Sequence, residues 1–254
     1  MSGHKKYLSV ALLSAVLLPA MASAADAPAT FTPEQEAKIG KIAADYLVAH
    51  PEVLLQASQK LQQIQAEQQA SAATQAVLKN AAVLTQDKNT PTYGPANGKV
   101  TVIEFFDYQC VYCSRLAPVM EQVIKAHPQT RFAFKEWPIF GGRWESSLEA
   151  AKTGLQIYQQ KGADAYLAYH NGIYATGHNE GKLTTADIQQ QAKKAADVEP
   201  VLQSINDLAQ EIGLSGTPGV IVMPTTGATE ASITVFPGLA DKASLEAAIK
   251  KAGG

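Results

Sequence analysis

The residues best suited to chemistry are the two cysteines of the chain, Cys110 and Cys113, which lie three positions apart. They follow the run 100–106, whose β-branched and aromatic residues predict a buried strand. Apolar residues then recur at helical spacing over 114–127. The Cys-Val-Tyr-Cys sequence is therefore expected where a strand leads into a helix.

That position favours redox chemistry. At a helix N-terminus, free backbone N–H groups and the helix dipole stabilise an anion, so the pKa of the Cys110 thiol should fall and its nucleophilicity should rise. Cys113 lies one turn further on and can close a small, reducible ring with Cys110. A thiolate attacks a disulfide through a mixed disulfide, which a second cysteine resolves. The pair is thus typical of a redox-active centre.

Two other uses of the cysteine pair remain open but are less favoured. A structural disulfide usually joins distant segments, whereas this spacing closes almost no loop. A zinc site needs further ligands, and the sequence has no second cysteine pair and no His-x3–5-His pattern. We therefore expect no metal ion and no cofactor in this protein.

The first 24 residues have the pattern of a secretory signal peptide. Lys5 and Lys6 precede the apolar run 8–21, and Ala22-Ser23-Ala24 is a small-x-small cleavage site. The apolar run is short for a membrane span and contains Pro19. An uncleaved anchor is the less favoured alternative. We expect residues 1–24 to be removed on export and the mature protein to lie in the periplasm of a bacterial envelope.

Charge and size exclude some functions. Removing residues 1–24 takes away two lysines and no acidic residue, which moves the formal charge from −2 to −4. Such a balance predicts neither nucleic acid nor an anionic membrane surface as a partner. A chain of this size can bury a core without disulfides. An exported protein with one closely spaced cysteine pair therefore uses it for chemistry rather than for stability.

Residues 25–87 are expected to form a helical arm and a linker. Thr32 and Pro33 begin one helix, and a second should run from Pro51 to about Leu84. The second helix carries a narrow, heptad-like apolar seam, which cannot bury itself. We favour self-association through this seam, as a homodimer with a trimer as the alternative, over packing on its own domain or a solvated helix. The seam residues are Leu54, Ala57, Leu61 and Ile64.

Residues 88–254 read as one α/β domain. The order of the segments predicts a mixed sheet with helices on its faces and an all-helical insertion at about 143–212. Strands are expected at 92–93, 100–106, 130–137, 220–223 and 232–236, and helices at 114–127, 145–161, 163–175, 185–211 and 244–251.

Two segments and this order of elements resemble thioredoxin-fold disulfide oxidoreductases of the DsbA type. The segments are Glu-Phe-Phe-Asp-Tyr-Gln-Cys-Val-Tyr-Cys at 104–113 and Gly-Thr-Pro-Gly-Val at 216–220. The resemblance covers 88–254 and implies a thioredoxin fold with a helical insertion. More weakly, 32–87 resembles the arms through which the Com1-like and ScsC-like branches of that family oligomerise.

The resemblance implies roles for individual residues. Cys110 would be the exposed nucleophile and Cys113 the more buried resolving thiol. Pro218 would be a cis-proline that faces the pair, leaving the backbone of Thr217 open to an extended substrate. A trans-proline that merely starts a strand is the alternative. The two residues between the cysteines, Val111 and Tyr112, are expected to contact the substrate.

Glu104 matches the buried acid that this family places beneath the disulfide. There its pKa would rise, and it could relay a proton to or from Cys113. The alternative is a carboxylate at the edge of the sheet. Lys135 is considered as its ion-pair partner. The histidines His127, His170 and His178 are expected in loops or at helix ends, in surface or structural roles.

The chain also departs from the strong oxidase of the family. Val-Tyr replaces Pro-His between the cysteines, which argues for a less oxidising pair. Thr217 before the proline and the arm resemble disulfide isomerases. The expected partners are exported proteins and a DsbB-like or DsbD-like membrane protein for recycling. The rival interpretation is a non-enzymatic periplasmic chaperone or copper-binding protein on a thioredoxin scaffold.

Overall fold

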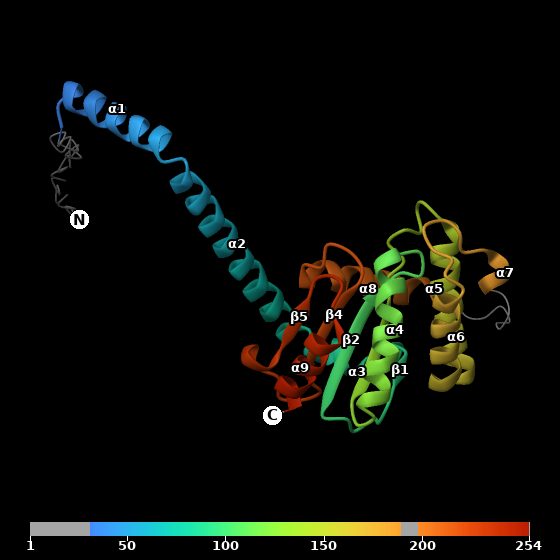
Figure 1. Cartoon of the computed structure of the whole chain (residues 1–254). Coiled ribbons are helices and arrows are strands. Elements are labelled where there is room, and N and C mark those ends of the chain that lie inside the picture. The colour runs from blue at the N-terminus through green and yellow to red at the C-terminus, as the bar shows by residue number, and fades with distance from the viewer. Residues whose placement is uncertain (1–30, 189–197, 254) are drawn as a thin grey trace, which may run out of the picture. The chain divides into compact units, whose positions relative to one another are not determined.

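The computed structural model describes residues 31–188 and 198–253 (Figure 1). The expected signal peptide lies outside these ranges. The chain divides into two compact units between Gln59 and Lys60, and the second unit contains the sheet and both cysteines. Within the described ranges, none of the helices combines the length and apolar character that crossing a bilayer requires.

The first unit starts with α1 (Pro33–Ala49), which begins as predicted. The Thr32 hydroxyl accepts a hydrogen bond from the Gln35 backbone N–H, and the Gln35 side chain accepts one from the Thr32 N–H. This reciprocal pair satisfies two of the free donors at the helix N-terminus. In the chain as described, α1 buries none of its residues.

The second predicted helix is interrupted, which corrects its expected end at Leu84. The structure has α2 (Glu52–Lys79) and a separate α3 (Ala81–Gln86). At the break, both the backbone N–H and the side-chain amide of Asn80 donate to the Ala76 carbonyl oxygen. An asparagine that bonds back to the preceding turn competes with continued helix.

The break lets both helices contribute to the core of the second unit. Val77 of α2 and Leu84 of α3 are buried in one cluster with Ile103 and Phe105. The compact unit therefore starts before residue 88, where the sequence pattern predicts the catalytic domain to begin. The alternation of Ala and Gln in this region hides the two core positions from a pattern-based division.

The sheet is mixed, as predicted, with strand order β1-β3-β2-β4-β5. β2 and β3 are parallel, and the other neighbours are antiparallel. The central strand β2 is buried along its whole length, as expected for a strand that is covered on both faces. The strands are β1 (Thr92–Tyr93), β2 (Val100–Phe106), β3 (Arg131–Glu136), β4 (Gly219–Pro224) and β5 (Thr234–Phe236).

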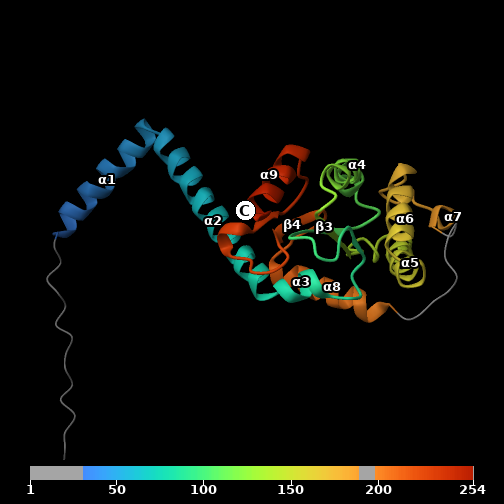
Figure 2. The ribbon, with the colours of Figure 1, turned by 90° about the horizontal axis from the view of Figure 1, so that it is seen from below.

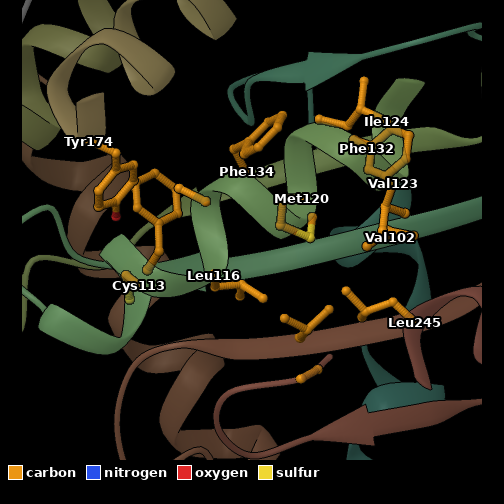
Figure 3. Packing of buried hydrophobic residues seen from close by; sticks show 14 of the residues in the cluster. Val102, Cys113, Leu116, Met120, Val123, Ile124, Phe132, Phe134, Tyr174 and Leu245 are labelled. Atoms are coloured by element: carbon orange, nitrogen blue, oxygen red, sulfur yellow. The ribbon is translucent and has the colours of Figure 1, made fainter. Parts of the chain in front are cut away.

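Helices cover both faces of the sheet (Figure 2). α4 (Val111–Ala126) and α9 (Lys242–Gly253) lie on one face, and α3 and α8 (Glu199–Ile212) lie on the other. Figure 3 shows Leu116, Met120 and Val123 along α4, packed towards Val102 of β2. Burial of each such side chain contributes roughly 1.5–3 kcal/mol to the stability of the fold. The apolar face of α4, packed against the sheet, therefore fixes the position of this helix.

The insertion is helical where it is described. It contains α5 (Glu145–Lys161), α6 (Ala163–Ala175), α7 (Thr185–Ile188) and α8. The helix predicted over 185–211 corresponds to α7 and α8, with 189–197 outside the described residues. α8 ends at Gly213 in the left-handed conformation (φ 82°), as predicted for a glycine stop. A short 3-10 turn at 230–232 replaces the predicted start of β5.

Candidate active site

The cysteine pair lies where the sequence places it. β2 ends at Phe106, a turn follows, and Cys110 is the N-cap residue of α4. The Cys110 backbone N–H donates to the Asp107 carbonyl oxygen at 3.0 Å, which closes the turn. Both cysteines carry free thiols in this structure. Cys110 thus faces the free N–H groups of the first helical turn.

Cys110 is less open than predicted. Only 4% of the residue is exposed, so its description as an exposed nucleophile is wrong. Its Sγ lies 3.2 Å from the Thr217 carbonyl oxygen, because the loop before β4 folds over it. The pKa of Cys110 is lowered to about 6, chiefly by a hydrogen bond from the Cys113 thiol. The backbone N–H groups of Tyr112 and Cys113 also lower this pKa, while burial opposes the shift.

Cys113 has the opposite environment. It is fully buried in the core with Leu116 and close to Tyr174 (Figure 3). Burial raises the pKa of Cys113, and the neighbouring Cys110 thiolate raises it further. One sulfur of the pair is therefore ionised near neutral pH and the other holds its proton, so the two thiols differ in the way that attack by Cys110 and resolution by Cys113 would require.

The Thr217–Pro218 peptide bond is cis, as predicted. The Thr217 hydroxyl is buried and has no hydrogen-bond partner among the described residues. The Thr217 carbonyl accepts from the protonated Cys110 thiol, but it cannot donate to a thiolate. The hydroxyl, which has no partner in the described part of the chain while Cys110 is protonated, can donate to the thiolate, and this lowers the pKa of Cys110. The two groups of Thr217 thus suit the two protonation states of the sulfur.

Glu104 is a buried acid, as the resemblance implies, and the alternative of an edge position is wrong. It lies on β2 between Phe134 of β3 and Val220 of β4, and it is fully buried. Neither carboxyl oxygen has a hydrogen-bond partner among the described residues. Burial raises the pKa of Glu104 to about 8, and its charge raises that of Cys113. Glu104 is thus able to hold a proton near the resolving thiol.

Lys135 does not pair with Glu104. In the parallel register Lys135 lies opposite Phe105, so its side chain points to the other face of the sheet from Glu104. Its buried ammonium group donates to the Thr90 hydroxyl at 2.5 Å and to Asp87 at 3.3 Å. Burial lowers the pKa of Lys135, whereas the Asp87 carboxylate raises it.

The two residues between the cysteines differ in exposure. Val111 is partly buried at the start of α4, while 52% of Tyr112 is exposed. The Arg115 guanidinium carbon lies 5.3 Å from the centre of the Tyr112 ring. An aromatic ring held by a cation one turn away offers an apolar contact surface beside Cys110.

Prediction from the sequence missed a set of buried polar residues around the turn before Cys110. The Asp107 carboxylate accepts hydrogen bonds from the Phe140 N–H and the Ser147 hydroxyl, both at 2.8 Å. Burial raises the pKa of Asp107 although these bonds oppose the shift. Gln109 is also fully buried. The sequence does contain a signal for these buried residues, because polar residues at 107 and 109 lie between a strand and a helix of the core.

A second buried acid lies on the same face of the sheet as Glu104. Glu136 accepts hydrogen bonds from the hydroxyl groups of Tyr108 at 3.1 Å and Tyr166 at 2.8 Å. Burial raises the pKa of Glu136, while these two bonds lower it. The sequence pattern predicts no role for this residue, because it alternates with its neighbours along β3 as in an ordinary strand.

The histidines follow the expectation only in part. His170 lies within α6, fully buried among aromatic rings including Phe106 and Phe134, so its expected place in a loop or at a helix end is wrong. Burial lowers its pKa to about 4. His127 is the C-cap of α4, and His178 contacts Asp187 at 3.0 Å. Within the described ranges, no three His, Cys, Asp or Glu residues are grouped as a metal site.

Two family models match parts of the chain. A thioredoxin family model matches residues 86–226, and the model of the copper resistance protein ScsC N-terminal domain matches 35–68. No curated protein sequence matches the chain.

Solved structures resemble most of the chain. Salmonella enterica Typhimurium BcfH is 39% identical, with a TM-score of 0.75 over 87% of this chain and 97% of its own. Proteus mirabilis ScsC in a transitional conformation is 26% identical, with a TM-score of 0.58 over 87% and 96%. A thioredoxin-like oxidoreductase from Silicibacter pomeroyi is 31% identical, with a TM-score of 0.52 over 67% and 96%. The chain therefore belongs to the thioredoxin family, and residues 35–68 match the N-terminal domain of ScsC.

Proposed function

We propose that this protein is a periplasmic thiol–disulfide oxidoreductase that forms disulfides in exported proteins, isomerises them, or does both. The observation that carries the proposal is the asymmetry of the pair. Cys110 is a recessed thiol whose pKa is lowered to about 6, and Cys113 is a buried thiol whose pKa is raised. A pair that differs in this way attacks with one sulfur and resolves with the other.

As an isomerase the protein starts with both thiols reduced. The Cys110 thiolate attacks one sulfur of a substrate disulfide, forming a mixed disulfide and releasing a substrate thiolate. That thiolate attacks another disulfide of the substrate. The new pairing is completed when a substrate thiolate attacks the mixed disulfide and Cys110 leaves as a thiolate. No electrons are gained or lost overall.

As an oxidase the protein starts with the Cys110–Cys113 disulfide. A substrate thiolate attacks the Cys110 sulfur, and Cys113 leaves as a thiolate that takes a proton, for which Glu104 is the nearby buried acid. A second substrate thiolate then attacks the mixed disulfide, which releases Cys110. The substrate loses two electrons, which the cysteine pair gains. A DsbB-like membrane protein would then accept those electrons and re-oxidise the pair, whereas a DsbD-like membrane protein would supply electrons and keep the pair reduced for isomerisation.

Substrates are proposed to bind as extended chains beside Thr217 and Pro218. The backbone of Thr217 precedes β4 and lies next to the Cys110 sulfur, so a polypeptide paired with it would present a cysteine to the nucleophile. The exposed ring of Tyr112 and the partly buried Val111 supply apolar contact area that does not depend on the sequence of the substrate.

We also propose that the arm assembles the protein into a homodimer, with a trimer as the alternative. Large apolar side chains along α1 and α2 are exposed in the single chain, and a seam of this kind is stabilised by a second copy. The ScsC N-terminal model matches this region. The exposed residues include Ile39, Ile42, Leu54, Leu55, Leu61 and Ile64.

A periplasmic location is supported by the charged and apolar pattern of residues 1–24. It is also supported by likeness to a solved structure titled as a periplasmic thioredoxin-like protein from Salmonella enterica serovar Typhimurium, which is 26% identical. The rival function, a non-enzymatic chaperone or copper-binding protein, is favoured by the family description of the matched arm as part of a copper resistance protein.

The proposal is tested by measuring reshuffling of a scrambled, disulfide-bonded protein. Cys110→Ser should abolish it, while Cys113→Ser should still attack and accumulate mixed disulfides. Reshuffling by Cys110→Ser would contradict the mechanism. The rival function predicts that Cys110→Ser leaves suppression of aggregation or copper binding intact and changes no redox property.

The direction of the reaction is tested in the native envelope by acid quenching and alkylation with a mass tag. A fully oxidised pair would assign the protein as an oxidase, and a fully reduced pair as an isomerase or reductase. A stable mixture would mean that one protein does both.

A further inference from the structure

Gln109, the residue directly before Cys110, is a fully buried polar residue whose four polar atoms all have partners. Its backbone N–H donates to the Asp107 carboxylate at 2.8 Å, and its carbonyl oxygen accepts from the Glu180 N–H at 3.0 Å. In the side chain, Oε1 accepts from the Gly181 N–H at 2.8 Å and Nε2 donates to the Ser146 hydroxyl at 2.6 Å.

Three of these four partners belong to the helical insertion. Ser146 lies in the first turn of α5, while Glu180 and Gly181 lie in the segment between α6 and α7. That segment has a defined shape, since Glu180 and Gly181 have φ values of 52° and 90°. A Cβ at Gly181 would lie 2.7 Å from the Trp144 indole nitrogen, so the segment also packs closely where it meets Gln109.

We infer that Gln109 is a positioning residue for Cys110, which fixes the turn carrying the nucleophile to the helical insertion. The hydrogen bonds hold the peptide unit that leads into Cys110, and the neighbouring Cys110 N–H is held by the Asp107 carbonyl oxygen. The Cys110 sulfur in turn needs a fixed place, because its contacts with Thr217 and with the first turn of α4 depend on tenths of an ångström.

The geometry separates this role from packing alone. An apolar side chain of similar length would fill the same volume but would leave the Gly181 N–H and the Ser146 hydroxyl without their partner. The insertion would then keep only the backbone hydrogen bond from Glu180 out of its three hydrogen bonds to Gln109, and Cys110 would lose part of the environment that stabilises its thiolate. The inference rests on the proposed function only through the Cys110 thiol.

The test uses the full, reduced chain and measures the rate of Cys110 alkylation by iodoacetamide against pH, with the modified cysteine identified by mass spectrometry. Gln109→Met should raise the midpoint of the curve of alkylation rate against pH by about one pH unit. This lowers the fraction of Cys110 that is thiolate at pH 6 about fivefold. Ser146→Ala, which removes one of the two side-chain bonds, should give a smaller shift in the same direction.

Thr101→Val is the matched control. Thr101 is buried at the other end of β2 and shares a hydrogen bond with the Thr225 hydroxyl at 2.9 Å. The control should lower the melting temperature and leave the alkylation midpoint unchanged. An unchanged midpoint in Gln109→Met, with a melting temperature lowered as in Thr101→Val, would overturn the inference.

Two further outcomes are decided by the same measurements. If Gln109→Met does not fold, a raised midpoint in Ser146→Ala supports the inference and an unchanged one overturns it. Alkylation reports on the thiol itself. A wild-type protein with a low midpoint but no effect on protein disulfides would contradict the proposed function, while the shift in Gln109→Met would still support the positioning role.

Discussion

The sulfur of Cys110 lies 3.2 Å from the carbonyl oxygen of Thr217, although the two residues are 107 positions apart in the chain. One comes from the start of α4 and the other from the loop before β4. The antiparallel pairing of β2 with β4 brings the two segments together, because the end of β2 lies beside the start of β4. This contact recesses the nucleophile and places a hydroxyl group within reach of its thiolate.

Thr217→Val should make the Cys110 thiol harder to ionise, while the contact with the Thr217 carbonyl oxygen remains. The hydroxyl contributes to the low pKa of Cys110, and a hydrogen bond to a charged group contributes roughly 1.5–3 kcal/mol. We expect the pKa of Cys110 to rise by about one unit, measured from the ultraviolet absorbance of the thiolate against pH. Thr225→Val, at the far end of β4, should leave the titration where it is. An unchanged titration in Thr217→Val would rule out the hydroxyl as a donor.

Glu104→Leu should change how the stability of the reduced protein depends on pH. The folded carboxyl has a pKa of about 8, against an ordinary value of 4.5. Between these values the unfolded chain loses the proton and the folded chain keeps it, so wild-type stability falls as pH rises, by up to roughly 5 kcal/mol.

The leucine variant has no carboxyl group at this position, so its stability does not fall in this way as pH rises. Its free energy of unfolding relative to the wild type should therefore increase steadily from pH 5 to pH 8, as measured by chemical denaturation with the cysteine pair kept reduced. A difference that stays constant over this range would mean that Glu104 does not keep its proton in the folded protein.

Gly154→Ala in α5 should destabilise the protein. A Cβ at this position would lie 2.5 Å from Oε1 of Glu136 and 3.3 Å from the rings of Tyr166 and Tyr169. Overpacking of this kind costs about 1–3 kcal/mol, which thermal unfolding can measure. The matched change Gly172→Ala in α6 meets no atom within 4 Å and should stabilise the protein, by up to about 1 kcal/mol. Equal effects of the two changes would contradict the packing around Glu136.

Charges on the seam of α2 should dissociate the proposed oligomer. Leu61 and Ile64 are 56% and 39% exposed in the single chain, so Leu61→Glu with Ile64→Glu removes little buried area from the monomer. Light scattering should show a lower mass than for the wild type. The control, Gln62→Glu with Ala66→Glu, adds the same charges off the seam and should keep the wild-type mass. A wild-type protein that is already monomeric would end the proposal.

Local patterns in the sequence determined the type and order of most elements. The Thr32 cap, the strand before Cys110, the helix after it and the Gly213 stop follow from rules that act over a few residues, and the structure confirms them. The same rules placed both cysteines at a strand-to-helix junction. The cis bond before Pro218 and the burial of Glu104 were implied by the resemblance rather than by the pattern.

Tertiary structure decided which side chains meet. In the register between β2 and β3, Lys135 lies opposite Phe105, so it faces the other side of the sheet from Glu104. No local sequence pattern predicts that register. The burial of His170 depends in the same way on where α6 packs against the sheet.

The surroundings of the nucleophile have the same origin. Thr217, which covers Cys110, is 107 positions away in the chain. The two partners of the Gln109 side chain, Ser146 and Gly181, are 37 and 72 positions away. The sequence therefore determined the reactive group, because a thiol at a helix N-terminus is a local arrangement. The fold determined its accessibility and its supports, because those depend on how distant segments pack.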